Sequence, residues 1–149
     1  MAFEQTRDVL DKAKKFHHEL QAFYRTTEET AGRERVRMVL DYLAQREAAL
    51  EAQLAEYERV TSSAVLDTWF TYAPAQHIGE ALARVRLRTD ATVPEVLGMA
   101  LQLDESLLQL YRQSAEVAPT ETHRELFMRL YEEGRQARTC LVLALFEPE

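Results

Sequence analysis

Four polar side chains stand where the helical pattern of this chain calls for apolar residues. They are His17, Glu47, Asp104 and Glu133. A carboxylate buried in an apolar core loses much of its solvation free energy unless a partner compensates it. Imidazole and carboxylate groups also form the mixed nitrogen and oxygen ligand sets that suit Fe, Mn or Zn. We therefore expect the four groups to meet in the core, where they satisfy one another, bind a cation, or do both.

The pattern around these residues predicts four long helices. Apolar residues recur at steps of three and four, which is the spacing of a buried helical face. The expected helices cover about residues 3–28, 33–60, 93–117 and 120–146. Each polar residue falls near the middle of one helix, and the midpoints of helices of similar length meet in one layer of a bundle. The pattern therefore predicts one polar layer halfway along the bundle.

Capping residues mark two of the helix starts. Thr92 and Glu95 have the spacing of a capping box, and Pro94 fits the first turn of the helix that follows. Thr30 is the expected N-cap of the second helix. Short connections are therefore expected within each helix pair, which makes the helices of each pair antiparallel.

Residues 61–92 have a weaker periodicity, and we expect a long crossover that carries one or two short helices. Such a crossover between the second and third helices is typical of the ferritin-like four-helix bundle, in which those two helices are parallel. Its aromatic residues Trp69, Phe70 and Tyr72 are expected to cover the end of the bundle, the alternative being a patch that binds a partner. The whole chain, 1–149, is expected to form one all-α domain.

Composition limits the classes of function. With 18 Lys and Arg against 25 Asp and Glu, the net charge is −7, which disfavours binding to nucleic acid or to an anionic membrane. The start of the sequence lacks the pattern of a secretion signal, and the single cysteine, Cys140, cannot form an internal disulfide, so a cytoplasmic location is expected. We expect Cys140 to be a buried filler on the last helix.

The two helix pairs look like copies of one hairpin. Superposing the second pair on the first matches His17 with Asp104, Tyr24 with Tyr111, and Glu47 with Glu133. The two tyrosines are expected to be core aromatics, with hydrogen bonding into the polar layer as the alternative.

Segments of all four helices resemble the rubrerythrin-type diiron domain of the ferritin-like superfamily. The segments are HHELQAFY, LDYLAQREAAL, LDESLLQLY and LFMRLYEEGRQA, and the crossover is not part of the resemblance. The resemblance implies that Glu47 and Glu133 match the glutamates of two Glu-x-x-His motifs, while His17 and Asp104 stand in place of two further glutamates.

Both histidines of those two motifs are replaced, by Leu50 and by Gln136. The resemblance implies a pair of irons held by four carboxylates and two imidazoles, as in a diiron oxidase or peroxidase. Leu50 cannot ligate a metal, and Gln136 is a weak candidate ligand. We therefore favour a metal-free polar layer; a single Fe, Mn or Zn ion held by some of the four polar residues is the alternative, and two ions fit the residues least.

These departures favour a non-catalytic binding or regulatory module that keeps the bundle and has lost diiron chemistry. A homodimer or another protein partner is expected under this interpretation. The alternative function is a metal-binding oxidoreductase or metal-handling protein of the rubrerythrin type. The sequence does not decide whether the protein is an enzyme; if it is one, a diiron-type oxidase or peroxidase is expected.

Overall fold

The computed structural model describes residues 4–70 and 78–146, and within them the chain is helical with no strand. The four long helices are α1 (Thr6–Thr30), α2 (Glu34–Val60), α5 (Val93–Glu116) and α6 (Glu121–Phe146). Two short helices, α3 (Ser63–Leu66) and α4 (Ile78–Ala83), lie in the connection between α2 and α5. The predicted all-α bundle with a long crossover that carries short helices is confirmed.

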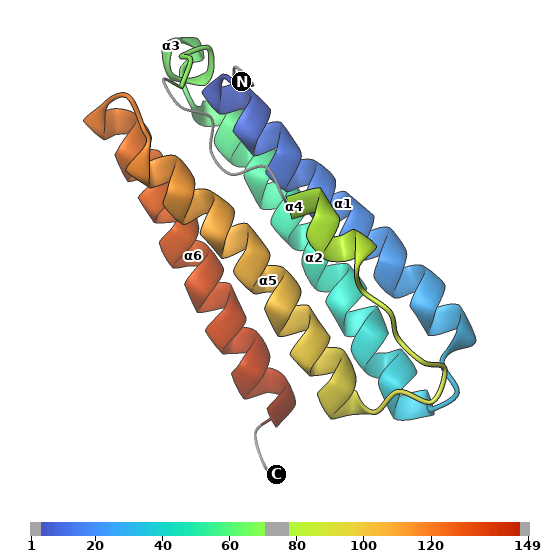
Figure 1. Ribbon diagram of the computed structural model, residues 1–149. Helices are drawn as coiled ribbons and strands as arrows, with labels where there is room; N and C mark the ends of the chain where they lie inside the picture. The colour runs from blue at the N-terminus through green and yellow to red at the C-terminus, as the bar shows by residue number, and fades with distance from the viewer. Residues whose placement is uncertain (1–3, 71–77, 147–149) are drawn as a thin grey trace.

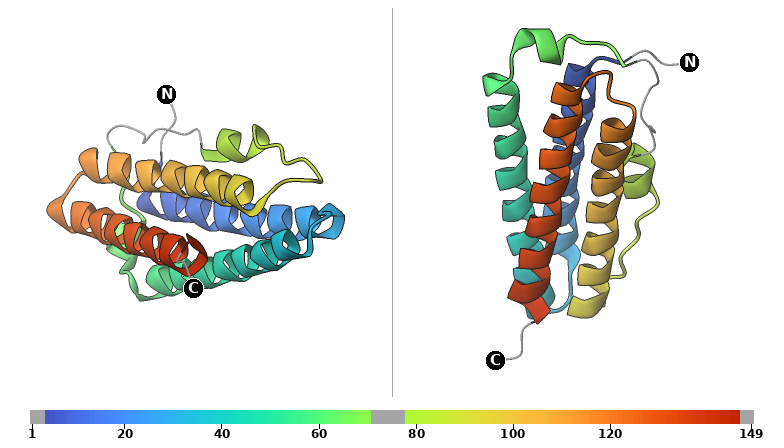
Figure 2. Two further views of the ribbon diagram at one scale, coloured as in Figure 1. Left: turned by 90° about the horizontal axis from the view of Figure 1, so that it is seen from below. Right: turned by 90° about the vertical axis from the view of Figure 1, so that its left-hand side faces the viewer.

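The four long helices lie side by side as an elongated bundle (Figure 1). Helices α1 and α2 form one antiparallel hairpin, and α5 and α6 form the other (Figures 1 and 2). The crossover makes α2 and α5 parallel, as expected. Helix α3 lies at the end of the bundle where α1 begins, and α4 packs along the side of α5 and α1.

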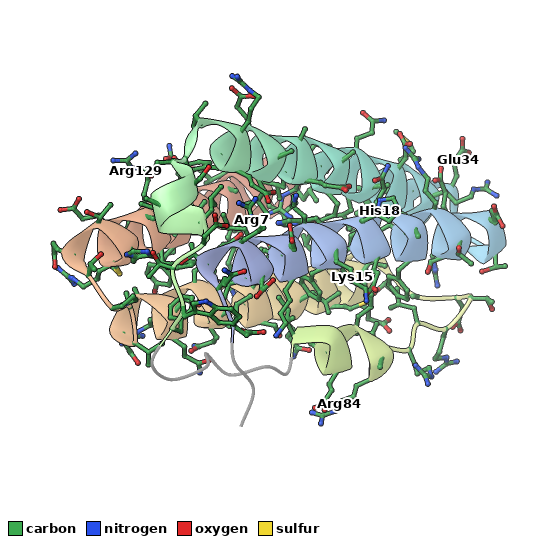
Figure 3. All side chains as sticks on the ribbon, turned by 90° about the horizontal axis from the view of Figure 1, so that it is seen from above. Arg7, Lys15, His18, Glu34, Arg84 and Arg129 are labelled. Atoms are coloured by element: carbon green, nitrogen blue, oxygen red, sulfur yellow. The ribbon has the colours of Figure 1, made fainter. Side chains whose placement is uncertain are left out.

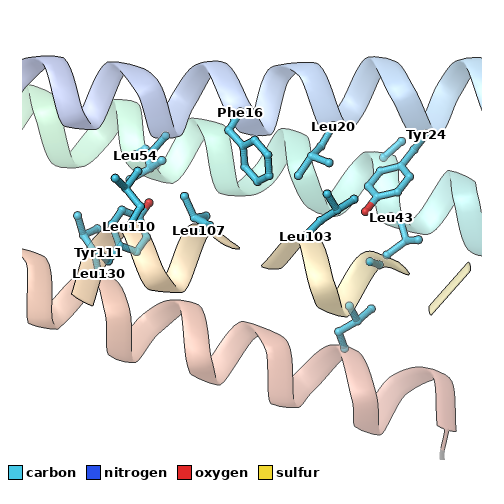
Figure 4. Close-up of a cluster of buried hydrophobic side chains, with 14 of the residues drawn as sticks. Phe16, Leu20, Tyr24, Leu43, Leu54, Leu103, Leu107, Leu110, Tyr111 and Leu130 are labelled. Atoms are coloured by element: carbon cyan, nitrogen blue, oxygen red, sulfur yellow. The ribbon is translucent and has the colours of Figure 1, made fainter. Parts of the chain in front are cut away.

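The core runs along the axis of the bundle and takes apolar side chains from all four long helices. Phe16, Leu20 and Tyr24 of α1 face Leu43 and Leu54 of α2 (Figure 4). Leucines of α5 and α6 complete the cluster, and its members are almost fully excluded from solvent. Burial of this apolar surface is the main force that holds four helices of such length together.

The helix starts agree with the sequence in one case and differ in the other. At the start of α5, the Thr92 hydroxyl accepts a hydrogen bond from the Glu95 amide, and the Glu95 carboxylate accepts one from the Thr92 amide, so the predicted capping box is confirmed. The prediction for Thr30 is wrong. Thr30 is the last residue of α1, and Arg33, which makes no side-chain capping bond, is the N-cap of α2.

The buried face of α6 differs from the expected one. Its most buried apolar residues are Phe127, Leu130 and Leu141, whereas Cys140 is exposed. The prediction that Cys140 is a buried filler is therefore wrong. Gly134 lies on the observed face, where an added Cβ atom would stand 2.6 Å from Cδ2 of Leu108, so a larger residue there would require the Leu108 side chain to move.

The first part of the crossover is tied to the N-terminal end of α1. The Phe70 amide donates to the Glu4 carbonyl (2.8 Å), and the Thr6 amide donates to the Thr68 carbonyl (3.0 Å). Phe70 is buried, with its ring centroid 5.8 Å from that of Phe127. Of the expected aromatic cluster, Phe70 thus covers the bundle end, Trp69 is exposed, and Tyr72 lies outside the described residues.

At the opposite end of the bundle, the connection between α1 and α2 is held to the last part of the crossover. The Gly32 amide donates to the Thr89 carbonyl (2.9 Å), and Arg33 Nε donates to the Asp90 carbonyl (3.3 Å). None of the helices in the described ranges combines the length and apolar content that a membrane span requires.

Candidate functional site

A buried network of charged side chains crosses the middle of the bundle and joins α1, α2 and α5. His17 Nδ1 donates to Glu47 Oε1 at 2.7 Å. The guanidinium of Arg46 donates a hydrogen bond of 3.1 Å to Glu47 Oε2. It also donates two hydrogen bonds to Asp104, of 3.2 Å to Oδ1 and 2.7 Å to Oδ2. Glu47 is fully buried, and His17 and Asp104 are nearly so. All four carboxylate oxygens of this network therefore have a hydrogen-bond donor.

Burial and ion pairing shift the pKa values of Arg46 and Asp104 in opposite directions. Burial raises the pKa of the Asp104 carboxyl, and the bond from Arg46 only partly offsets this effect. Burial alone would lower the pKa of Arg46, but the hydrogen bond and charge of Asp104, together with the charge of Glu47, raise it. Arg46 therefore stays charged, and it is the fixed cation of the network.

Glu133 lies apart from this network, on α6. It is partly buried, and its carboxylate accepts a hydrogen bond of 2.6 Å from the Tyr57 hydroxyl and a longer one of 3.5 Å from Gln53. Burial and the bond to Glu133 raise the pKa of Tyr57 to about 12. Glu133 is thus held by neutral donors of α2, whereas Glu47 is held by a guanidinium and an imidazole.

A small cavity of about 40 Å³ lies between the network and Glu133. Its polar lining residues are His17, Arg46, Asp104, Glu133 and Gln53. The remaining wall is apolar, with a group of lining residues from α2, α5 and α6: Leu50, Leu54, Leu107, Leu108, Tyr111, Leu130, Gly134 and Ala137. The volume is enough for water or one small ion.

The charges of the site shift the pKa values of the two core tyrosines, Tyr24 and Tyr111, although neither hydroxyl forms a hydrogen bond to the network in the described part of the chain. Burial, followed by the charges of Glu47 and Asp104, raises the pKa of Tyr24. Burial, followed by the charges of Glu133 and Glu47, raises the pKa of Tyr111. No hydrogen bond joins either hydroxyl to the network within residues 4–70 and 78–146, and their alternative role as donors into the layer finds no contact to support it.

The structure brings together three of the four residues expected at the site, His17, Glu47 and Asp104. Glu133 borders the same cavity but bonds elsewhere. The neighbouring His18 is exposed on α1 (Figure 3), and it pairs with Glu51. No three His, Cys, Asp or Glu side chains of the described ranges are grouped closely enough to act as a metal-ligand set.

Arg46 is the site residue that the sequence pattern missed. It stands next to Glu47, outside the apolar face of α2, so its position in the helix predicts a solvated side chain. Its long stem instead carries the guanidinium back into the core, and its side chain is only 11% exposed. The signal that could have found it is the charge balance: three acids and one histidine at one level require a cation, and Arg46 is the basic residue at that level.

The two positions that replace the histidines of the resembled motifs have different surroundings. Leu50 lines the cavity, where it adds an apolar wall. Gln136 is exposed and is not among the residues that line the cavity, and its role as a weak ligand stays a prediction. The cause is the turned face of α6, which places Gly134 and Ala137 toward the cavity and Gln136 away from it.

No protein-family model matches this sequence, and no curated protein matches it. A solved structure does match in shape: a Thermotoga maritima protein that is provisionally described as a ferritin-like diiron-carboxylate protein. The TM-score is 0.59 at 18% sequence identity, and the match covers 99% of this chain and 98% of the other. Likeness at this level of identity establishes the fold and not the chemistry. The chain therefore has the ferritin-like four-helix-bundle fold.

Proposed function

We propose that this chain is a ferritin-like bundle protein of the rubrerythrin type in which an internal ion-pair network replaces the diiron centre, and that it works as a non-catalytic binding or regulatory module. The observation that carries this proposal is the position of Arg46. Its guanidinium bonds both Asp104 oxygens and one Glu47 oxygen in the middle of the bundle.

The residues present do not fit a pair of iron ions. The carboxylate oxygens that would bridge two ions are engaged by Arg46 and His17, and a dication beside a buried guanidinium is repelled by it. The fold neighbour is described as a diiron-carboxylate protein, but here Leu50 supplies a methyl-lined wall and Gln136 faces outward. Arg46 supplies the positive charge that a metal would otherwise bring to these carboxylates.

A metal-loading experiment tests the proposal. Protein incubated with ferrous iron without oxygen and then desalted is expected to retain well below one ion per chain and to consume no oxygen when it is returned to air. One or more ions held per chain by the unaltered protein, and lost in a Glu47→Ala, Glu133→Ala double variant, would overturn the proposal.

Removal of the internal cation gives a second, independent measurement. In Arg46→Gln the side chains of His17, Glu47 and Asp104 lose the guanidinium and are left with an excess of negative charge. We expect Mn²⁺ or Zn²⁺ to bind this variant at least about tenfold more tightly than it binds the unaltered protein. We also expect the ion to raise the melting temperature of the variant more than that of the unaltered protein. Arg59→Gln is the control, since Arg59 makes an exposed pair with Glu56.

The alternative function is a metal-binding oxidoreductase or metal-handling protein of the rubrerythrin type that uses one ion. The observation in its favour is the cavity, because His17, Asp104 and Glu133 all line it. Under this alternative, the unaltered protein binds a single Fe, Mn or Zn ion, and Asp104→Asn and Glu133→Gln each weaken that binding. Equal metal content in the unaltered protein and in both variants would count against it.

A further inference from the structure

A groove lies between the first half of α5 and the connection that leads to it from α4. Its volume is about 620 Å³, which is within the range of binding clefts. None of the described residues that line it also lines the cavity in the middle of the bundle, so it is a separate site. The groove runs along α5 from Pro94 to Ser106, a length of about 18 Å at the rise of an α-helix. A chain of about five or six extended residues has the same length.

The connection beside the groove alternates in side-chain character. Arg84, Arg86 and Arg88 are exposed, while Val85 and Leu87 between them are half-buried and pack on the core. This period of two is that of an extended chain, which turns successive side chains to opposite sides. Arg84 points away from the bundle (Figure 3). Three cations therefore stand close together on the surface of a chain whose net charge is −7.

The charges of Arg84 and Arg88 are only weakly balanced within the protein. Arg84 pairs with Glu80 at 3.5 Å, and Arg88 pairs with Asp90 at 3.1 Å. All four side chains are more than half exposed, and ion pairs in water contribute little to stability. A carboxylate from another molecule can therefore replace either acid with little loss of stability.

Arg86, which lines the groove, has no carboxylate partner. Its Nη1 donates to the carbonyl oxygens of Ala83 and Val85, at 2.9 and 2.7 Å, and no ion pair includes it in the described part of the chain. Glu95 is the one acid among the described lining residues, and its carboxylate accepts bonds from Thr92 in the capping box. The groove therefore keeps a positive charge that an acidic ligand can neutralise.

The backbone of the connection has unused hydrogen-bond donors. Within residues 4–70 and 78–146, the amides of Arg86, Leu87 and Arg88 donate to no protein acceptor. An extended backbone with unpaired amides can take up a second strand, which supplies carbonyl acceptors. Such backbone bonds give affinity, and the side chains at alternate positions then select the partner.

The α5 side of the groove has room for the side chains of such a strand. A Cβ atom added at Gly98 would lie in open space, and Met99 beside it is half-buried. Together with Leu103 these residues form an apolar wall of the groove. An apolar side chain that covers this wall is removed from water, which favours binding.

We propose that this groove binds an extended, acidic segment of a partner protein, in which carboxylates alternate with apolar side chains. The backbone of the segment pairs with residues 86–88, and its carboxylates lie against Arg84, Arg86 and Arg88. Its apolar side chains cover Met99. A small anion would leave the apolar wall uncovered, and a helix would leave the amides unpaired. The proposal does not depend on the state of the network in the middle of the bundle.

A synthetic peptide tests the proposal. A fluorescein-labelled octapeptide of alternating glutamate and valine is expected to bind the unaltered protein with a Kd below about 300 µM, as measured by fluorescence anisotropy. The matched octapeptide of alternating lysine and valine is expected not to bind, because the groove is positively charged. A weaker Kd for the acidic peptide, or equal binding of the two peptides, would overturn the proposal.

Gly98 and Gly79 give a matched pair of variants. An added Cβ atom lies in open space at both positions, but of the two only Gly98 lines the groove. Gly98→Leu should fill the groove and raise the Kd of the acidic peptide at least about tenfold. It should not lower the melting temperature, because leucine favours a helix more than glycine does. Gly79→Leu should leave the Kd unchanged, and normal binding by Gly98→Leu would contradict the proposal.

The charge and the backbone contacts are tested separately. Arg86→Glu should weaken binding of the acidic peptide at least about tenfold, whereas Arg135→Glu, at an exposed arginine of α6, should bind normally. Hydrogen exchange of amides within residues 86–88 should slow when the peptide is bound. Unchanged exchange there would overturn the strand pairing. Tighter binding of dodecanoate or of a helical acidic peptide would assign the groove to another occupant and would also overturn the proposal.

Discussion

Glu47 and Glu133, which the sequence pattern matches between the two hairpins, lie in different surroundings. Glu47 is fully buried, and both of its oxygens accept bonds from a guanidinium and an imidazole. Glu133 is only partly buried and accepts bonds from a phenol and an amide. The first hairpin thus holds its acid in a charged, closed environment, and the second holds its acid at the edge of a cavity.

The residues beside the two acids differ. Arg46, next to Glu47, forms the ion-pair network of α2, whereas Gly134, next to Glu133, brings no charge to α6 and packs near Leu108. Symmetry in the sequence pattern therefore does not guarantee symmetry of the site. Two hairpins with similar sequence patterns can place the same residue type in two electrostatic settings when the adjacent side chains differ.

The largest effect is expected from removal of the cation at the first acid. Arg46→Ala leaves the carboxylates of Glu47 and Asp104 buried without their main partner, and loss of one member of a buried ion pair costs about 3–5 kcal/mol. Urea denaturation should therefore give a much lower free energy of unfolding. Arg59→Ala, which breaks an exposed pair with Glu56, should cost less than about 1 kcal/mol. Similar losses for the two variants would refute the network.

Replacing Glu47 and Glu133 by glutamine, one at a time, should also give unequal losses of stability, but smaller ones than Arg46→Ala. Glu47→Gln weakens bonds to two groups that carry or can carry positive charge, and about 1.5–3 kcal/mol of stability should be lost. Glu133→Gln keeps an acceptor for Tyr57 and should cost less than about 1 kcal/mol. Thermal unfolding of both variants measures the ratio, and a larger loss for Glu133→Gln would contradict the assignment of the closed site to Glu47.

Asp104 should make a contribution to the free energy of unfolding that decreases as the pH rises, because burial raises the pKa of its carboxyl group. Because burial raises its pKa in the folded state, the unfolded chain releases this proton first as the pH rises. The contribution of Asp104 to the free energy of unfolding is therefore full below the ordinary value of 3.8 and is lost as the pH rises through the raised pKa. Above that pKa the contribution no longer changes with pH.

Asp104→Asn should remove this decrease in the free energy of unfolding with rising pH. Urea denaturation at a series of pH values measures the change. Asp41→Asn gives the opposite case, since the hydrogen bond from Arg25 lowers the pKa of the exposed Asp41. The contribution of Asp41 is lost as the pH falls through that lowered pKa and is present above 3.8. If both variants altered the pH profile in the same direction, the electrostatic description of Asp104 would be wrong.

The smallest effect is expected at Cys140, on the turned helix α6. The thiol is exposed, so it should react with a thiol reagent in the folded protein at nearly the rate of the unfolded chain. Cys140→Ser should change the free energy of unfolding by less than about 0.5 kcal/mol. Slow labelling that speeds up on unfolding would instead place Cys140 in the core, as the sequence pattern predicts, and would mean that α6 is not turned.

Much of the architecture follows from the pattern of the chain. The spacing of apolar residues predicts the four long helices and the crossover, and Thr92 with Glu95 predicts the start of α5, because each of these features depends on neighbours in sequence. The burial of His17, Glu47 and Asp104 follows from the same spacing.

The rest of the site depends on contacts that the periodicity cannot express. Arg46 reaches the core through the length of its side chain, although its helix position points to the surface. Gly134 has no side chain to count as apolar, so the pattern on α6 favours Glu133 in the core, whereas in the structure Gly134 lies against Leu108 and Glu133 is only partly buried. A count of charges at each level of the bundle, and not of apolar residues alone, would have drawn attention to Arg46.

The hydrogen bonds between residues 4–6 and residues 68–70 have a consequence for the order of folding. These segments are far apart along the chain, and the antiparallel hairpin of α1 and α2 lies between them. Once that hairpin exists, its open ends are already neighbours, so joining them closes only a short effective loop. The tie should therefore form after the hairpin, and pulsed hydrogen exchange should protect the amides of Thr6 and Phe70 later than those in the middle of α1 and α2.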